Sequence, residues 1–377
     1  MVPAMHLART SRRAPARAAV LALGLTLSWL PAGTAGAAPG PTVVVSGLDN
    51  PRGLVLGKKG QLFVGEAGHA GPTCTAVQGE TGPLCIGFTS RISSVALKSG
   101  KRTTVVDGLP SLGSAVGSTG VDGVSYNDGV VSGIVTFSPQ GVPPDVCVGA
   151  PEPACSKAVK KARRNLGDLI QPRKDDVTTV AEVGRYNYDY IVANKTRLDP
   201  ANPDFRPGDS NPYGITAGPK DGWYVVDAGS NTLNLVTRKG KVTVLAYLPN
   251  PPGPADRFPY DSVPTCVATA GNAVWVGTLA GQVFRWDGHA MTQVADRSDG
   301  LTAINGCGTD KAGNLYVSNI FGITPDTFFA PHTGFLNKVT PGGTVTLVKG
   351  SKGLSYPAGV VVDRDGSLLV AVQSICP

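Results

Sequence analysis

Short apolar runs alternate with glycine-rich turns along most of the chain. Three segments share one order: a P-x-G triplet, an apolar run, a turn, and a second run that opens on an aromatic residue or leucine. The triplets begin at Pro51, Pro212 and Pro357, and the second runs begin twelve residues later at Phe63, Tyr224 and Leu369. Turns such as Asp221-Gly222 contain residues that tolerate the positive φ of tight hairpins. Each segment is therefore predicted to begin as a β-hairpin.

Further copies of this pattern bring the number of repeats to six. Two copies lead from Pro264 to Trp275 and from Ile304 to Tyr316, and a weaker one covers Val121 to Ile134. A second hairpin follows in four copies, with turns at Ser99-Gly100, Lys239-Gly240, Asp287-Gly288 and Gly342-Gly343. Four antiparallel strands per repeat form a propeller blade, and the last four second runs begin 41 to 53 residues apart, which is typical of blades. The sequence predicts an all-β, six-bladed β-propeller of four-stranded blades.

The two ends of the repeat array are incomplete in complementary ways. The last copy ends shortly after its second run, at residues 367–373, whereas the apolar run at residues 42–46 has no hairpin before it. An open sheet edge invites aggregation. We therefore expect residues 42–46 to complete the last blade and to close the ring.

One partly helical insertion, at about residues 138–209, interrupts the second repeat. Residues 155–166 and 180–194 have helical spacing, and the first of these segments contains five basic residues. Such a helix covers a blade with its apolar side and keeps its charges in water, or it forms a lid over a binding site. We favour the first interpretation, because a run of charges usually marks a solvated face.

The first 37 residues have the pattern of a cleavable signal peptide. Four arginines precede an apolar stretch at residues 18–30, and Ala35-Gly36-Ala37 supplies small residues for cleavage. The apolar stretch is too short for a permanent membrane anchor. We expect residues 1–37 to be removed, residues 38–377 to form a single propeller domain, and the protein to be secreted and extracellular.

The net charge gives no reason to expect a nucleic-acid or membrane partner. The chain has 34 basic and 27 acidic residues, and the signal peptide takes four arginines with it, which leaves a net charge of only +3. No basic stripe is interleaved with aromatic residues. We expect a monomer whose partner is a small molecule, a glycan or a protein at the propeller mouth.

All seven cysteines lie after the signal peptide, and export makes disulfides the expected state. Two pairs are close in sequence within Gly/Pro-rich stretches, and a third pair occupies nearly the same place in consecutive repeats. The predicted pairs are Cys74 with Cys85, Cys147 with Cys155, and Cys266 with Cys307, which leaves Cys376 as the odd thiol. A zinc site is the alternative, but the sequence contains no C-x-x-C.

Five stretches of the chain share motifs with a known family. They are residues 47–54, 65–68, 209–214, 225–231 and 262–265, and the run Asp209-Ser210-Asn211-Pro212-Tyr213-Gly214 is the most specific of them. With these motifs the chain resembles the ScyD/ScyE family of secreted bacterial β-propeller proteins, and its repeats are similar to NHL repeats. The resemblance implies export and a propeller, but it implies no particular substrate.

Motifs of serine- or histidine-based catalysis are missing from the sequence. It contains no G-x-S-x-G and no H-E-x-x-H. The histidines that remain after signal removal are His69, His289 and His332, all in turn-like or polar contexts. Acid–base catalysis by histidine is therefore poorly supported.

The position three residues after the start of each second run could supply oxygen ligands for a metal. It holds Glu66, Asp227, Thr278, Asn319 and Val372. Propeller lactonases of the gluconolactonase type hold a divalent cation with carboxylates and asparagines at the central channel. A carboxylate at this position also serves the turn by accepting backbone N–H bonds. We favour the turn role for Glu66 and Asp227.

Two functions from different classes stay open. The favoured one is a secreted, non-catalytic binding or scaffold propeller without a cofactor, because acids are missing from the rim positions at Thr278 and Val372. The alternative is a metal-dependent hydrolase or lactonase that uses a divalent cation such as calcium. The candidate ligand-binding or metal residues are Glu66, Asn211, Tyr213, Asp227 and Asn319.

Overall fold

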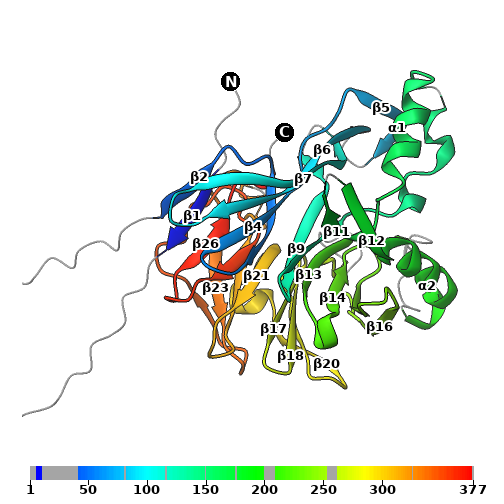
Figure 1. Cartoon of the computed structure of the whole chain (residues 1–377). Coiled ribbons are helices and arrows are strands. Elements are labelled where there is room, and N and C mark those ends of the chain that lie inside the picture. The colour runs from blue at the N-terminus through cyan, green and yellow to red at the C-terminus, as the bar shows by residue number, and fades with distance from the viewer. Residues whose placement is uncertain are drawn as a thin grey trace, which may run out of the picture.

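Strands pair antiparallel throughout the part of the chain that the structure describes (Figure 1). The structure is a computed structural model, and it describes residues 6–10, 41–79, 82–114, 117–148, 150–174, 176–198, 209–252, 261–324 and 326–375. Cys376 lies outside these residues. Apolar runs separated by turns that tolerate positive φ, such as Gly240, Gly271 and Gly366, account for the short strands and their meander order.

Three sheets follow the predicted blade pattern of four consecutive strands, ordered from the innermost strand to the outermost. The first contains β13 (Pro212–Ala217), β14 (Trp223–Asp227), β15 (Thr232–Val236) and β16 (Val242–Tyr247). The second contains β17 (Pro264–Ala270), β18 (Ala273–Thr278), β19 (Val283–Trp286) and β20 (Met291–Ala295). The third contains β21 (Ile304–Thr309), β22 (Leu315–Asn319), β23 (Phe335–Val339) and β24 (Val345–Leu347). Short 3-10 helices, η3 (Pro219–Asp221) and η4 (Arg297–Asp299), lie in their connections.

The second repeat also forms a four-stranded sheet, but with two long connections. Its strands are β9 (Val121–Asn127), β10 (Val130–Val135), β11 (Asp168–Arg173) and β12 (Asp176–Glu182). The 3-10 helices η1 (Pro139–Gly141) and η2 (Pro144–Cys147) and the helix α1 (Ala154–Ala162) lie between β10 and β11, and α2 (Val183–Leu198) follows β12. The region predicted as a single insertion thus returns to the sheet at residues 168–182, where β11 covers the free edge of β10.

The first repeat departs furthest from the blade pattern. It forms a six-stranded sheet of β3 (Pro51–Leu56), β4 (Gln61–Glu66), β5 (Thr73–Gly79), β6 (Gly82–Ala96), β7 (Lys101–Ser114) and β8 (Gly117–Thr119). The long hairpin of β6 and β7 extends beyond the blade, and α1 packs beside it against β5, β6 and β7 (Figure 1). The basic helix therefore covers an extension of the first sheet, as the favoured interpretation of the insertion expects.

The innermost strands contact one another in a closed sequence, in the order β3, β9, β13, β17, β21, β25 and back to β3. The molecule is therefore an all-β propeller with few helices. Among the described residues, five sheets have four strands and the sheet of the first repeat has six. The prediction of six four-stranded blades is wrong in this count, because the long hairpin recruits β5 and β8 into the sheet of the first repeat.

The last sheet brings together the two ends of the chain. Its order is β2 (Thr42–Ser46), β1 (His6–Thr10), β26 (Leu368–Ala371) and β25 (Val360–Val362). The strand at residues 42–46, expected to close the ring, lies in this sheet at its outer edge, and β1 separates it from β26. Because β1 falls within the predicted signal peptide, completion of the last blade by residues 42–46 and signal cleavage both stay predictions.

The glycine of the P-x-G triplet is required by the contact between neighbouring innermost strands. A Cβ atom at Gly53 would lie 2.8 Å from the carbonyl oxygen of Asp122, the middle residue of the next triplet. The same conflict with the next middle residue recurs for Gly123 with Tyr213, Gly306 with Ala358, and Gly359 with Arg52. For Gly214 the corresponding distance to the Thr265 carbonyl oxygen would be 3.1 Å. Each glycine therefore lets one repeat approach the next, and Gly359 also donates its N–H to the Arg52 carbonyl at 2.9 Å.

The apolar core lies between neighbouring sheets, where each strand face meets the face of the next repeat. One layer joins Trp275 and Val283 to Ile304 and Val317, and all four side chains are buried. No single repeat could bury its apolar residues alone, and the stacking of adjacent sheets in a ring buries them.

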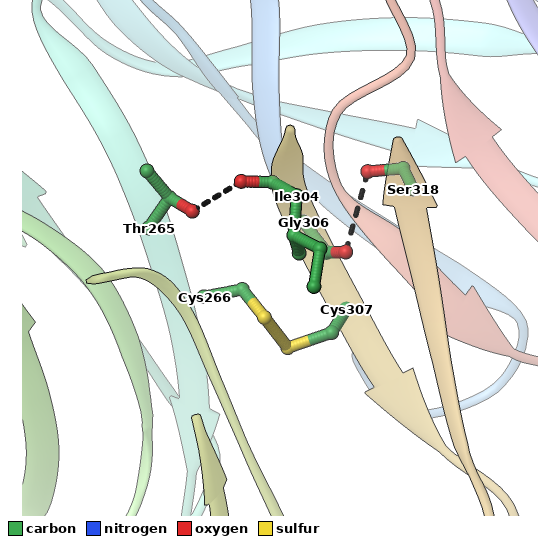
Figure 2. The surroundings of a disulfide bond; sticks show 6 residues. All are labelled: Thr265, Cys266, Ile304, Gly306, Cys307 and Ser318. Carbon is green, nitrogen blue, oxygen red and sulfur yellow. Dashed lines mark hydrogen bonds between the residues drawn. A yellow bond between two sulfur atoms is a disulfide. The ribbon is translucent and has the colours of Figure 1, made fainter. Parts of the chain in front are cut away.

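The structure confirms the three predicted disulfides, including the pair across two repeats. Cys74–Cys85 joins β5 to β6, and Cys147–Cys155 joins η2 to the first turn of α1. Figure 2 shows the Cys266–Cys307 bridge between β17 and β21, and the Cα atoms of the two cysteines are 5.6 Å apart. Cys266 occupies the glycine position of its triplet. Three disulfides are typical of an oxidising compartment, and in the described residues no helix is long and apolar enough to cross a membrane.

We predict that the disulfide between repeats stabilises the fold more than the local one. Cys266 and Cys307 are 41 residues apart, whereas Cys147 and Cys155 are 8 apart. Loop-closure entropy then gives about 4 kcal/mol for the first bridge and about 2.5 kcal/mol for the second. Equilibrium unfolding of the two double alanine variants should show this order, and the reverse order would contradict it.

A buried carboxyl at the start of β11 links stability to pH. Burial raises the pKa of Asp168 to about 7, although the Thr179 hydroxyl donates to its Oδ2 at 2.7 Å and acts in the opposite direction. Between about pH 4 and pH 7 the folded protein therefore holds a proton that the unfolded chain has released. The free energy of unfolding therefore falls as the pH rises through that range, because the folded protein loses the advantage of this bound proton.

We expect Asp168→Asn to remove this dependence. The free energy of unfolding of the variant relative to wild type should rise between about pH 4 and pH 7, by at most about 1.4 kcal/mol per pH unit, and then level off. Urea unfolding at a series of pH values measures the difference. A difference that stays constant with pH would refute the assignment.

Candidate functional site

The two ends of the propeller carry different connections. First and second strands are joined by tight turns of at most five residues, as at 128–129, 218–222 and 310–314. At the opposite end, the connections 136–167, 183–211, 248–263 and 320–334 are much longer. We call these the tight-turn end and the long-connection end. Binding residues gather on such connections, so the long-connection end is the elaborated mouth.

The middle residues of the triplets meet at the axis, at the long-connection end. Five of them are polar: Arg52, Asp122, Tyr213, Thr265 and Asn305. Each occupies a β-bulge, because the pairing between the first and second strands skips this residue. A bulge re-aims a side chain out of the regular alternation. The repeats thus direct one side chain each toward the axis, and we call these five residues the axial ring.

Three members of the axial ring form a hydrogen-bonded chain that joins three alternate sheets. Arg52 donates from Nη1 to the Tyr213 hydroxyl at 3.1 Å, and that hydroxyl donates to Asn305 Oδ1 at 2.9 Å. Arg52 also donates from Nη2 to the Ser118 carbonyl at 2.6 Å, and its Nε lies 3.8 Å from Asp122 Oδ1. Burial raises the pKa of Tyr213 to about 12, against the opposing charge of Arg52. Tyr213 is therefore neutral in the physiological pH range.

A cavity of about 200 Å³ runs from this ring along the innermost strands. Apolar side chains such as Leu54, Val124 and Ile215 line its walls. Three polar atoms of the lining, Arg52 Nε, Asn305 Nδ2 and Ser125 Oγ, are buried and have no hydrogen-bond partner in the described part of the chain. Buried polar groups are nearly always hydrogen-bonded, so these three atoms are available to a polar group that enters the cavity.

The predicted rim residues lie beside this ring and hold it in place. Glu66, Asp227 and Asn319 pair with Pro51, Pro212 and Ile304, which directly precede the middle residues. Each accepts a backbone N–H from the segment that leads into the innermost strand. The donors are Asp49 to Glu66 at 2.6 Å, Asn211 to Asp227 at 2.8 Å, and Thr302 to Asn319 at 2.7 Å. The three side chains are positioning residues for the axial ring.

Asp227 is the most heavily engaged of these side chains. Its Oδ1 accepts three backbone N–H bonds, from Asn211, Gly229 and Ser230. Its Oδ2 accepts from the Ser210 hydroxyl at 2.6 Å and from Asn187 of α2 at 2.8 Å. One carboxylate therefore ties the helix α2 and a turn to the start of β13.

The other predicted site residues are placed as follows. Tyr213 belongs to the axial ring, whereas the Asn211 side chain accepts the Phe137 N–H at 2.8 Å and holds the start of the connection 136–167. His69 Nδ1 lies 2.8 Å from Asp49 Oδ2, and His332 Nδ1 lies 2.8 Å from the Ser355 hydroxyl. His289 lies in a turn at the other end of the propeller. Within the described ranges, no three acidic, histidine or cysteine side chains form a metal-binding group.

Sequence reasoning missed Arg52, Asp122, Thr265 and Asn305. It used the P-x-G triplet to align the repeats and did not assign a role to its variable middle residue. The signal was present, since a fixed proline and glycine around a changing polar residue is the pattern of a common backbone with a repeat-specific side chain. The convergence of these residues, however, depends on closure of the ring.

Comparisons with known proteins add little beyond this geometry. No protein-family profile and no curated protein sequence matches the chain. Three solved structures are similar to the chain. A streptogramin B lyase shares 13% identity over 87% of this chain and 92% of its own, with a TM-score of 0.45. An auxiliary nutrient binding protein from Bacteroides thetaiotaomicron shares 10% identity over 87% of this chain and 68% of its own, with a TM-score of 0.48, and the calcium-binding protein regucalcin from Agrobacterium tumefaciens shares 11% identity over 85% of this chain and 89% of its own, with a TM-score of 0.45. With TM-scores below 0.5, these likenesses transfer no function. The resemblance to ScyD/ScyE proteins rests on the sequence motifs alone.

We predict that Asp227→Ala destabilises the fold without any change in metal binding. The substitution leaves three backbone donors without their acceptor, which should lower the free energy of unfolding by about 1–3 kcal/mol. Asp221→Asn, which removes the charge of an exposed pair with Arg238 and suits the positive φ of this position, is the control and should cost at most about 1 kcal/mol.

Calorimetry and unfolding in chelator check this prediction. The loss in Asp227→Ala should be the same with calcium, magnesium, manganese or zinc as with chelator. A stoichiometric cation that disappears in both Asp227→Ala and Glu66→Ala, with chelator destabilising only the wild type, would show that these carboxylates are metal ligands.

Proposed function

We propose that this chain is an exported propeller that binds a small, neutral, partly apolar molecule in the axial cavity without transforming it. The observation that carries the proposal is the buried amide nitrogen of Asn305, which lines the cavity without a partner in the described chain. A ligand oxygen that accepts from this nitrogen would remove the cost of an unsatisfied buried donor, about 1–3 kcal/mol.

The charges around the cavity favour a neutral ligand. Arg52 and Asp122 compensate each other at the axis, and Tyr213 stays neutral because burial raises its pKa to about 12. A ligand with a net charge would leave the guanidinium or the carboxylate poorly compensated in a buried place. A neutral carbonyl or hydroxyl oxygen can instead accept from Asn305 without adding an uncompensated charge to the cavity.

The walls and the size of the cavity favour a compact ligand with an apolar body. Leu54, Val124, Ile215, Val267 and Val360 surround the axis beyond the polar ring. The volume of about 200 Å³ is below the range of about 300–1,000 Å³ that holds drug-sized molecules. Lactones, cyclic amides and other small ring compounds with one carbonyl fit both the polarity and the size.

Export is part of this proposal. The chain begins with a pattern typical of secretory signal peptides, and its three disulfides suit an oxidising compartment. A propeller held by covalent bridges and by a closed ring suits a monomeric binding protein outside the cell.

We expect a ligand of this class to stabilise the wild type and to lose affinity in Asn305→Asp. This variant keeps the oxygen that accepts from Tyr213 and replaces the free donor by an acceptor. The control Asn165→Asp makes the same change outside the cavity. Thermal unfolding with a panel of small lactones and cyclic amides should show a shift for wild type and Asn165→Asp, and at least tenfold weaker binding for Asn305→Asp.

Two outcomes would overturn the proposal. Equal binding by wild type and Asn305→Asp would place the ligand elsewhere. Turnover of a lactone that needs added calcium or manganese and is lost with chelator would instead establish the hydrolase alternative.

A further inference from the structure

The helix α1 presents a stripe of basic side chains to solvent. Lys157, Lys160 and Lys161 are spaced i, i+3 and i+4, which places them on one side of the helix, and Arg164 lies in the turn directly after α1. All four are exposed. At about 1.5 Å of rise per residue, the helical part of the stripe is about 6 Å long. We call these four residues the basic stripe.

The opposite side of α1 fixes the direction in which the basic stripe points. Cys155, Val159 and Ala162 are buried in one apolar cluster with Ile86 and Leu112 of the long hairpin. The Cys147–Cys155 disulfide attaches the first turn of the helix to η2. Lys161 also lies over the Phe88 ring, 3.8 Å from its centroid. The four charges are therefore held on a rigid support and are not carried by a free tail.

The basic stripe lacks compensating acids. None of its four side chains forms an ion pair with the residues that the structure describes, whereas the exposed Arg185 pairs with Glu182 at 3.0 Å. Like charges at i,i+4, such as Lys157 with Lys161, destabilise a helix by about 0.2–0.5 kcal/mol per pair. An anionic partner removes this repulsion and gains the attraction of all four charges.

An aromatic pair on α2 extends the surface. Arg163, which directly precedes Arg164, donates to the carbonyl oxygens of Pro139 and Val142, and η1 contacts α2 in turn, so η1 connects the end of α1 to α2. The rings of Tyr186 and Tyr190 on α2 stack with centroids 6.4 Å apart, and Tyr186 is 39% exposed. Figure 1 shows both helices on the same side of the propeller. Exposed rings offer a flat apolar face to the C–H face of a sugar.

We propose that the basic stripe and Tyr186 bind an anionic linear polysaccharide. Regularly spaced carboxylates of the polymer pair with the stripe, and a sugar ring packs on the tyrosine. A polysaccharide is favoured over a nucleic acid because the proposed export brings the protein to extracellular polymers and because the aromatic pair belongs to a different helix and is not interleaved with the stripe. This interaction is separate from the axial cavity and attaches the protein to a matrix.

Binding to immobilised polygalacturonate tests the proposal, with neutral dextran and a short DNA duplex as comparisons. The test variant carries K157E, K160E, K161E and R164E. The matched control carries K58E, K59E, K239E and K241E, four exposed lysines in turns of the tight-turn end, and has the same net charge. We expect the wild type to bind at low salt, with affinity that falls as salt increases. The test variant should bind at least tenfold more weakly, and the control variant should change by less than about threefold.

Further variants keep the result interpretable. If the glutamate variant has altered circular dichroism, the four glutamine substitutions at the same positions replace it. Tyr186→Ala should weaken binding while the salt dependence stays the same, because it removes no charge. Both sets of variants should retain small-ligand binding in the axial cavity, and Asn305→Asp should retain polysaccharide binding, so the two proposals fail independently.

Several results would overturn the proposal. An equal loss in the test and control variants would mean that net charge alone attracts the polymer. Unchanged binding by a folded test variant, or absence of wild-type binding at low salt, would exclude the basic stripe. Tighter binding to the DNA duplex than to polygalacturonate would exclude the polysaccharide as the partner, and unchanged binding by Tyr186→Ala would exclude the sugar contact.

Discussion

The whole molecule depends on the close approach of neighbouring innermost strands around the axis. In five of six triplets, a glycine faces the backbone carbonyl of the next middle residue, and in four of these a Cβ atom would lie within 2.8 Å of that carbonyl oxygen. The sixth, at Cys266, replaces this approach by a covalent bond to Cys307 of the following repeat. Because each repeat is fixed to the next at this point, the apolar layers between sheets come into register and the middle side chains are forced toward the axis.

A second group of side chains stabilises this arrangement from the neighbouring strand. Glu66, Asp227 and Asn319 differ in charge and length, yet each accepts a backbone N–H from the segment that leads into an innermost strand. Their oxygens are therefore used by the fold itself. The chemistry available to a ligand is that of the axial ring, where the charges of Arg52 and Asp122 compensate each other and an amide donor is left over. This division of roles favours recognition of a neutral molecule over metal-assisted hydrolysis.

The elaborations of the repeat are confined to one end of the propeller. Tight turns at the other end leave no room for additional surface, whereas the long connections carry α1, α2 and the extended hairpin. Two of the three disulfides stabilise these additions, which have little core of their own. A covalently supported helix can display like charges that an isolated peptide of this length would not hold in place. Binding surfaces can therefore vary at this end while the ring stays unchanged.

The sequence by itself determined the repeat, the strand pattern, the propeller class and all three disulfides, because these follow from local chemistry: apolar alternation, turn glycines, and cysteines at matching places. It also located the two helices of the long connections. It predicted six regular blades, whereas the sheet of the first repeat has six strands, because β5 and β8 pair with the long hairpin of β6 and β7, which the repeat pattern does not contain. Only the tertiary structure decided which polar residues form the site. Arg52, Tyr213 and Asn305 are separated by 161 and 92 residues in the chain, and they meet because ring closure and a bulge in each innermost strand bring them to one axis.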